Sequence, residues 1–322
     1  MSIRLSIVIP YFKKRFFPEA LGSLTRQTSR EFEIFVGDDA SPDAPAEILR
    51  QSAGDLAVKY KRFPDNLGRS SLARQWNRCV QETDSEWVWL FSDDDLADPS
   101  CVASFLRELD HEPKYDLYRF EKGVVDDDGV ERFHRVEVPA VESAEELALS
   151  RFSESRSITV PEHIFSRKAF DREGGFVDFP LAWCTDDATW AAFARITGVR
   201  TIGGGRVLWR NGQFNLSAPD QNIALKMKAF QLYLMWLQKN FPGAEFQSRL
   251  RNASREWFPL AFSWLGKSVP LRELLRFWLA YNQFAGRREW RMLMRMLRAN
   301  SPASYRWRRI KRGAGCCFNR VA

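Results

Sequence analysis

Short apolar runs alternate with amphipathic segments through the first hundred residues of the chain. Runs typical of buried strands cover residues 5–10, 32–37, 56–63 and 87–91. Apolar residues at helical spacing lie between them, at 18–28, 46–51 and 69–80. Strands that alternate with helices of this length form βαβ units around a parallel sheet. The pattern therefore predicts an α/β fold with a Rossmann-like, mostly parallel sheet flanked by helices.

The alternation loosens after residue 99. We expect strands at 115–120, 130–138, 201–202 and 207–209, a helix at 142–152, and a loop through 165–180 with a turn at Gly174-Gly175-Phe176. From residue 219 the pattern is helical, with amphipathic segments at 223–239, 255–265, 271–284 and 287–297. Because 322 residues are long for a single core, we expect two domains, 1–218 and a C-terminal helical region at 219–322.

Carboxylates follow two of the predicted strands. Asp38 and Asp39 follow the apolar run at 32–37, and Asp93, Asp94 and Asp95 follow the run at 87–91. Adjacent like charges are tolerated in water or around a cation, so either acidic group alone could be a solvated loop. The carboxyl ends of parallel strands, however, share the edge where open α/β sheets bind ligands. Two acidic groups on one such edge favour a single pocket.

Two further acidic groups have simpler explanations. Asp126-Asp127-Asp128 precedes Gly129, and Asp-Gly turn chemistry accounts for it. Asp186-Asp187 follows Thr185 at the start of a predicted helix. Thr185 is suited to cap that helix, and acidic residues in a first turn are stabilising. From the local sequence alone, Asp186-Asp187 is either helix capping or a catalytic pair.

The net charge of +7 is unevenly distributed. Residues 251–322 hold 16 Lys and Arg against 3 Asp and Glu, while the rest of the chain holds 32 against 38. A basic C-terminus needs an anionic partner, which is a lipid surface, an anionic acceptor or nucleic acid. Arg and Trp along residues 271–312 suit peripheral contact with an anionic membrane, although ordinary helix packing explains the same pattern. No nucleic-acid-binding motif is present, so we expect no nucleic-acid partner.

Neither the apolar runs nor the cysteines indicate export or membrane insertion. No run approaches the roughly 18 apolar residues that a membrane span needs. The five cysteines show no metal-binding or disulfide spacing: Cys79, Cys101, Cys184, Cys316 and Cys317. We expect a reduced cytoplasmic protein, or one at the inner face of the membrane.

Four motifs in order resemble the family 2 glycosyltransferases with the GT-A fold. They are SIVIPYF (6–12), QTSREFEIFVGDDASPD (27–43), DNLGRSSLARQWN (65–77) and WVWLFSDDDLADP (87–99). The resemblance is close over about residues 4–110 and looser to about residue 217, through Gly174-Gly175-Phe176 and Asp186-Asp187. It implies a nucleotide-sugar donor and a divalent cation, Mn²⁺ or Mg²⁺.

The resemblance also implies roles for residues of the N-terminal part. Residues that end the first strand would hold the nucleotide base: Pro10, Tyr11 and Phe12, with Lys13 where the family usually has Asn. Asp39 matches the carboxylate that recognises the base. Residues of the segment that closes over the nucleotide would be Asn66, Gly68 and Arg74.

In the family's DxD signature, Ser92 replaces the first Asp. Asp93 then falls near ribose and phosphate, Asp94 matches the metal-binding acid, and Asp95 is an additional acid assigned to the metal. Asp187 matches the catalytic base. The loop from Arg210 matches the segment that helps to hold the pyrophosphate, with Asn211 and Gln213 where a His is often found.

This resemblance implies an inverting transfer from a nucleoside diphosphate sugar, with uridine as our default nucleotide. The acceptor would be a hydroxyl of a carbohydrate or lipid-linked glycan in bacterial surface polysaccharide assembly. Two alternatives stay open. Ser92 and the missing His are compatible with a non-catalytic sugar-nucleotide-binding or scaffold protein. A nucleotidyltransferase is the other, but residues 10–15 lack its Gly-rich phosphate loop. The sequence predicts no oligomeric state.

Overall fold

The computed structural model describes residues 4–52, 56–132, 138–153, 157–212, 222–264 and 269–300. The chain divides into two compact units, one of Met1–Arg151 with Ser155–Asn215 and one of Phe152–Glu154 with Leu216–Ala322. Several expected features lie outside the described residues, namely 133–137 of the strand expected at 130–138, Gln213, the 301–312 part of the basic segment, Cys316 and Cys317.

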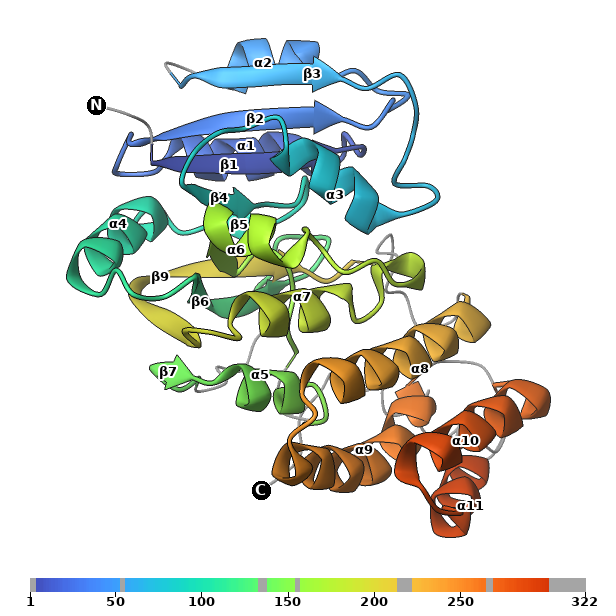
Figure 1. The fold of residues 1–322 in the computed structure, drawn as a ribbon. Coiled ribbons are helices and arrows are strands. Elements are labelled where there is room, and N and C mark those ends of the chain that lie inside the picture. The colour runs from blue at the N-terminus through green and yellow to red at the C-terminus, as the bar shows by residue number, and fades with distance from the viewer. Residues whose placement is uncertain are drawn as a thin grey trace. The chain divides into compact units, whose positions relative to one another are not determined.

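The first unit is built on one twisted sheet (Figure 1). Its strands lie in the order β3 (Val58–Arg62), β2 (Phe32–Asp38), β1 (Leu5–Tyr11), β4 (Trp87–Leu90), β8 (His163–Ser166), β6 (Leu117–Val125), β9 (Val199–Arg210) and β5 (Leu96–Ala97), and β7 (Val141–Glu142) pairs with β9. The first four strands are parallel. β8 runs antiparallel between β4 and β6, and β6 is parallel to β9. The prediction of a mostly parallel α/β sheet is confirmed.

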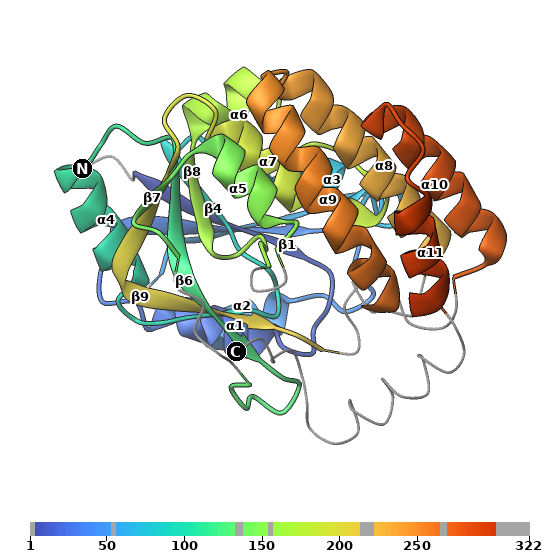
Figure 2. The same ribbon diagram turned by 90° about the horizontal axis from the view of Figure 1, so that it is seen from below.

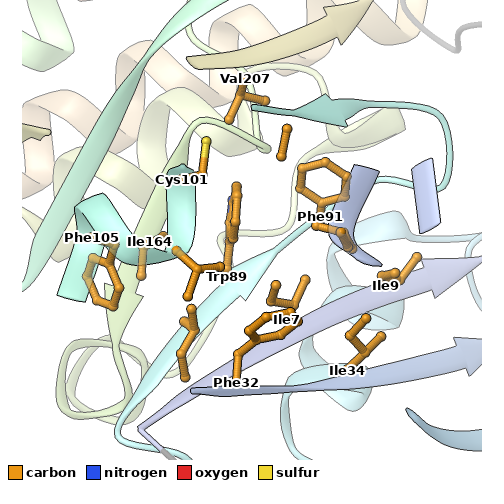
Figure 3. Close-up of a cluster of buried hydrophobic side chains, with 14 of the residues drawn as sticks. Ile7, Ile9, Phe32, Ile34, Trp89, Phe91, Cys101, Phe105, Ile164 and Val207 are labelled. Atoms are coloured by element: carbon orange, nitrogen blue, oxygen red, sulfur yellow. The ribbon is translucent and has the colours of Figure 1, made fainter. Parts of the chain in front are cut away.

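Helices cover both faces of this sheet, which is why its central strands are continuously apolar. The helices are α1 (Phe17–Thr25), α2 (Ala46–Ser52), α3 (Leu72–Val80), α4 (Cys101–His111), α5 (Ala144–Ser150), α6 (Arg167–Glu173) and α7 (Thr185–Phe193). Figure 2 shows α1 and α2 on one side of the strands and α6 and α7 on the other. On the α1 side, alternate strand residues such as Ile7, Ile34 and Trp89 form one buried cluster with Phe105 of α4 (Figure 3).

The second unit is helical and has an aromatic core. It contains α8 (Ile223–Asn240), α9 (Ala244–Trp264), α10 (Leu271–Ala285) and α11 (Trp290–Ala299). Phe258 of α9 packs its ring against Phe230 of α8 and Phe277 of α10. The expected C-terminal helical region is confirmed. No helix among the described residues is long and apolar enough to cross a membrane.

Several elements differ from expectation. The loop expected at 165–180 contains the end of β8 and all of α6, whose first turn is capped by the Ser166 hydroxyl. The expected turn follows, with Gly174 at a φ of 77°. The two short strands expected after residue 200 are one strand, β9, which continues through its three consecutive glycines. A side chain at Gly205 would come within 3.0 Å of the Cys101 sulfur, so glycine permits this close passage.

Helix starts also differ from expectation. α3 begins at Leu72 rather than residue 69, because the Ser71 side chain caps it by accepting a hydrogen bond from the Arg74 N–H. α9 begins at Ala244 rather than residue 255. Its early turns bury few apolar side chains, among them Phe246 and Leu250, and therefore show little periodicity.

Candidate active site

The two acids at the end of β2, Asp38 and Asp39, differ in the groups that they bind. Asp38 is fully buried and accepts hydrogen bonds from the Ser41 N–H, the Tyr60 hydroxyl and the Arg62 guanidinium, each at 2.7 Å. These bonds tie the end of β2 to β3 and to the following turn. Asp38 is therefore a structural carboxylate.

Asp39 instead binds the segment that follows β3. Its two oxygens accept hydrogen bonds from the N–H groups of Leu67 and Gly68, both at 2.8 Å. A Cβ atom at Gly68 would lie 2.6 Å from Asp39 Oδ2, so this approach requires glycine. Burial raises the pKa of Asp39, while these backbone bonds and the Arg78 charge lower it. Asn66, in the same segment, accepts a hydrogen bond from the Arg69 N–H.

Arg78 is a residue of this site that sequence reasoning missed. Its guanidinium donates to Asp39 Oδ1 at 2.5 Å and to Asp65 Oδ1 at 2.9 Å, and it lies 4.0 Å from the Phe63 ring centre. Arg78 lies one helical turn after Arg74, and this i, i+4 spacing was the available signal. Arg74 is exposed and makes no side-chain hydrogen bond or ion pair to the described residues.

The loop after β1 is bound to the acidic loop after β4. The N–H groups of Phe12 and Lys13 both donate to Asp93 Oδ2, at 2.9 and 2.7 Å. Tyr11 is buried and donates its hydroxyl to the Asp43 carbonyl, at 2.7 Å. Pro10 is the preceding residue of β1 and is paired with Gly37 of β2. The predicted donor-binding residues Pro10, Tyr11, Phe12, Asp39 and Asp93 thus come from adjacent strands at one sheet edge.

Asp94 and Asp95 have less complete hydrogen bonding. Asp95 is fully buried; its Oδ1 accepts from the Arg210 N–H at 2.7 Å, but its Oδ2 has no hydrogen-bond partner within the described part of the chain. Burial raises the pKa of Asp95 well above its usual value. Burial and the neighbouring Asp93 charge raise the pKa of Asp94 to about 7.

These two carboxylates fit a hard divalent cation, which prefers oxygen ligands. The structural observation that supports this fit is Asp95 Oδ2, to which no described residue donates a hydrogen bond. The described residues contain no group of three or more metal-binding side chains. Asp94 and Asp95 would therefore supply only part of a coordination shell, and phosphate oxygens and water would complete it.

Arg210, at the end of β9, is buried beneath this loop. Its guanidinium donates to the carbonyls of Asp94 and Asp126, both at 2.9 Å, and to Glu19 at 2.7 Å. It also lies 4.0 Å from the Phe16 ring centre. These contacts hold the acidic loop in place; direct contact of Arg210 with pyrophosphate stays a prediction. Asp126 begins the expected turn, in which Gly129 has a φ of 76°.

The acids of α7 follow a strained segment. Leu181, Ala182 and Cys184 all have φ between 52° and 63°, which non-glycine residues adopt only when the surrounding structure imposes it. Cys184, not Thr185, is at the N-cap, and no side chain caps the helix. The expectation that Thr185 caps this helix is wrong, because Thr185 is inside the first turn, where its hydroxyl accepts from the Phe179 N–H.

Asp187 is buried, with 3% of its surface exposed. Its Oδ2 lies 3.2 Å from Arg151 Nε, whereas its Oδ1 has no hydrogen-bond partner among the residues described. Asp186 accepts a hydrogen bond from the Asp187 N–H. Burial raises the pKa of Asp187, which the charges of Arg151 and Lys122 lower. A buried carboxylate with one unpartnered oxygen can accept a proton from a bound hydroxyl.

Glu162 and Lys122 connect the two acidic groups electrostatically, and sequence reasoning missed both. The Glu162 charge raises the pKa of Asp95, Asp186 and Asp187. Lys122 Nζ lies 3.3 Å from Glu162 Oε1. Burial raises the pKa of Glu162, but Lys122, His163 and bonds from Thr159 outweigh it and give a pKa of about 2. A permanently charged Glu162 therefore acts on both the acidic loop after β4 and α7.

The mostly parallel sheet with acids at the carboxyl ends of its strands has the arrangement of a GT-A fold. The family model described as glycosyl transferase family 2 matches residues 6–173, more than half of the chain. The chain therefore belongs to glycosyl transferase family 2, which confirms the resemblance seen in the sequence.

Similar proteins include an uncharacterized glycosyltransferase of Haemophilus influenzae, 29% identical over 110 residues, or 34% of this chain and 35% of that protein. Validoxylamine A glucosyltransferase of Streptomyces hygroscopicus is 39% identical over 67 residues, or 20% of this chain and 16% of that protein. The matches thus span about a third or less of these relatives' lengths.

Two solved structures share the fold. Staphylococcus aureus TarS 1-349 in complex with UDP-GlcNAc has a TM-score of 0.67 and 16% identity, and the match covers 98% of this chain and 93% of that one. A mannosyltransferase of Pyrobaculum calidifontis in complex with GDP-Man and Mn²⁺ has a TM-score of 0.52 and 17% identity, covering 95% and 87%. At these identities the likeness shows the fold alone.

Proposed function

We propose that this protein transfers a sugar from a nucleoside diphosphate sugar to a hydroxyl acceptor, with inversion. The observation that carries the proposal is the buried Oδ1 of Asp187, which has no hydrogen-bond partner among the residues that the structure describes. An inverting displacement at the anomeric carbon needs one carboxylate base to remove the acceptor proton. A retaining route through a covalent intermediate would also need a nucleophile.

On the donor side, different residues of the first unit would contact different parts of the nucleotide. The end of β1 and the residue after it, Pro10 to Phe12, would contact the base with Asp39. Asn66, Gly68 and Arg74 would close over it, and Asp93 would lie near ribose and phosphate. Asp94 and Asp95 would hold Mn²⁺ or Mg²⁺; when bound, such a cation neutralises charge on the diphosphate leaving group.

We further propose a uridine diphosphate sugar as donor and a carbohydrate or lipid-linked glycan as acceptor, in bacterial surface polysaccharide assembly. The TarS structure that shares this fold contains UDP-GlcNAc. Staphylococcus aureus TarS is named a poly(ribitol-phosphate) beta-N-acetylglucosaminyltransferase, and it is 27% identical to this chain over 112 residues.

The direct test is nucleoside diphosphate release from UDP-GlcNAc and from GDP-mannose, with Mn²⁺ and after EDTA treatment. Hydrolysis of one donor, with water as the acceptor, is expected to require the cation. Binding of a donor without any release, with or without added glycans, would instead support a non-catalytic sugar-nucleotide-binding protein.

For the helical unit, proposed as a separate domain from residue 219, we propose peripheral contact with an anionic membrane on the cytoplasmic side. One stripe of α10 exposes Leu271, Leu275 and Leu279, to 57%, 37% and 57%. The exposed guanidinium groups of Arg272 and Arg276 flank it. Leucines beside arginines suit the boundary between acyl chains and anionic headgroups.

Cosedimentation with phosphatidylglycerol vesicles tests this contact. The double variant Leu275→Gln with Leu279→Gln is expected to lower the bound fraction several-fold. Met235→Gln is the matched control, because Met235 is 62% exposed on α8. Equal binding by both variants would contradict membrane contact through α10.

A further inference from the structure

Arg151 reaches the proposed base from a different helix. It follows α5, whose first turn is fixed by a reciprocal capping pair between Ser143 and Glu146. α5 packs against α7, and this packing brings Arg151 beside Asp187, 36 positions later in the chain. The guanidinium also lies 5.9 Å from the Trp183 ring centre, in the strained segment before α7. Arg151 is therefore enclosed by the elements that place Asp187.

The contact with Arg151 makes the environments of the two Asp187 carboxylate oxygens different. Oδ2 lies 3.2 Å from Arg151 Nε, and Oδ1 has no hydrogen-bond partner in the described part of the molecule. A general base needs one oxygen directed at the hydroxyl and a second group that orients the carboxylate. Arg151 occupies the orienting position and leaves Oδ1 to the acceptor.

We propose that Arg151 is a positioning residue, which holds Asp187 in its ionised form and directs Oδ1 toward the acceptor hydroxyl. The proposal rests on the proposed function of Asp187 as the base. It assigns Arg151 no contact with the donor nucleotide.

Several charged groups around Asp187 affect its pKa, and Arg151 is one of them. Asp186 lies beside it on α7, Lys122 faces it from β6, and Glu162 faces it from the segment before β8. Burial and Glu162 favour the protonated carboxyl, while Arg151 and Lys122 favour the carboxylate. Of the two cations that lower the pKa of Asp187, Arg151 has the larger effect and Lys122, which is paired with Glu162, the smaller.

Arg151→Met is therefore expected to raise the pKa of Asp187. A base works only when ionised, so its activity is lost as the pH falls through this pKa. Removing a cation at this distance raises a carboxyl pKa by about one to three units. The acid limb of the pH–rate profile for nucleotide release should move upward by that amount, and the rate should recover at high pH. Arg151→Lys should restore most of the original profile.

The measurement uses the full-length protein and whichever of UDP-GlcNAc or GDP-mannose the wild type hydrolyses. Nucleoside diphosphate binding, followed by thermal shift, reports whether each variant is folded. Arg172→Met is the matched control, because Arg172 pairs with Asp116 at 2.8 Å, contacts α7 only at its other end through the Phe193 carbonyl, and is not among the main causes of the pKa shifts of Asp186 and Asp187. Its acid limb should stay in place.

Two results separate this proposal from the proposed function. If Asp187→Asn retains nucleotide release, Asp187 is not the base, so the mechanism proposed through Asp187 and the positioning role of Arg151 both fail. If Asp187→Asn is inactive, while folded Arg151→Met and Arg151→Lys variants lose rate equally at every pH, the positioning role of Arg151 is wrong and Asp187 remains the base.

Discussion

The acids at the end of β2 and the acid of α7 are equally buried, but their hydrogen bonding differs. Asp38 accepts three hydrogen bonds, one from the turn after β2 and two from β3, and Asp39 binds two backbone N–H groups and a guanidinium. Asp187 has one oxygen beside Arg151 and one without a hydrogen-bond partner in the described residues. Burying an unpaired polar atom costs free energy, so the Asp187 arrangement is unfavourable for folding alone.

This difference in hydrogen bonding indicates two different roles for buried aspartates in this protein. The β2 acids hold the loops around the proposed nucleotide site, and their loss should affect folding or binding. Asp187 and Asp95 each have a carboxylate oxygen that no described residue binds, and a bound ligand could contact that oxygen. Loss of Asp187 should affect chemistry.

The largest expected effect is that of Asp187→Asn on turnover. General base catalysis contributes about 10²- to 10⁴-fold, so nucleotide release should fall by that factor. The amide cannot accept the proton, but it occupies the same space. Nucleotide binding by thermal shift should persist, and turnover within about threefold of the wild type would contradict the assignment.

Asp38→Ala should mainly destabilise the fold. It leaves the Ser41 N–H and the Tyr60 hydroxyl without their acceptor and Arg62 without its ion pair. We expect a loss of about 3 kcal/mol in the free energy of unfolding, measured by urea denaturation. A loss below about 0.5 kcal/mol would show that these bonds do not stabilise the end of β2.

Gly68→Ala should weaken nucleotide binding about tenfold, which corresponds to about 1.4 kcal/mol. The added Cβ would displace the segment from Asp39, whose Oδ2 would be 2.6 Å away. Gly243→Ala is the control, since a Cβ atom added there would have no neighbouring atom within 4 Å. If calorimetry gives the two variants equal affinity for the nucleotide, the contact between Gly68 and Asp39 does not contribute to nucleotide binding.

Arg74→Met should have the smallest effect. The side chain is exposed and has no polar partner among the described residues, so stability should be unchanged. Loss of one exposed charge near a diphosphate should weaken nucleotide binding about fivefold, or roughly 1 kcal/mol. If the affinity of Arg74→Met for the nucleotide is unchanged, Arg74 does not contact the nucleotide.

Sequence patterns predicted the regular parts of this fold well, because β1, β2 and β4 are apolar on both faces and the intervening helices are amphipathic. They failed where tertiary contacts decide the structure. β8 and α6 are short and polar in part, and β9 continues through three glycines that local propensity assigns to a turn. The start of α9 is set by packing of only a few residues, such as Phe246 and Leu250.

The same limit applies to the site. Asp39, Asp94, Asp95 and Asp187 could be located because they lie in motifs or directly after strands. Arg151 and Glu162 carry no motif: each reaches the acids through packing of elements distant in sequence, which only the fold reveals. The sequence pointed to Arg210 as a pyrophosphate contact. In the structure its guanidinium is buried beneath the acidic loop, where it donates to the Asp94 and Asp126 carbonyls and to Glu19.

The most direct measurement is a thermal-shift comparison of UDP, GDP, TDP and CDP, each with and without Mn²⁺, on the wild type and on Asp94→Asn. Ligands that bind only the folded state raise its melting temperature. We predict that one nucleotide raises the melting temperature in a Mn²⁺-dependent way and that Asp94→Asn loses this dependence. Absence of a shift with every nucleotide, in a protein that melts cooperatively, would contradict a functional nucleotide-sugar site at this edge of the sheet.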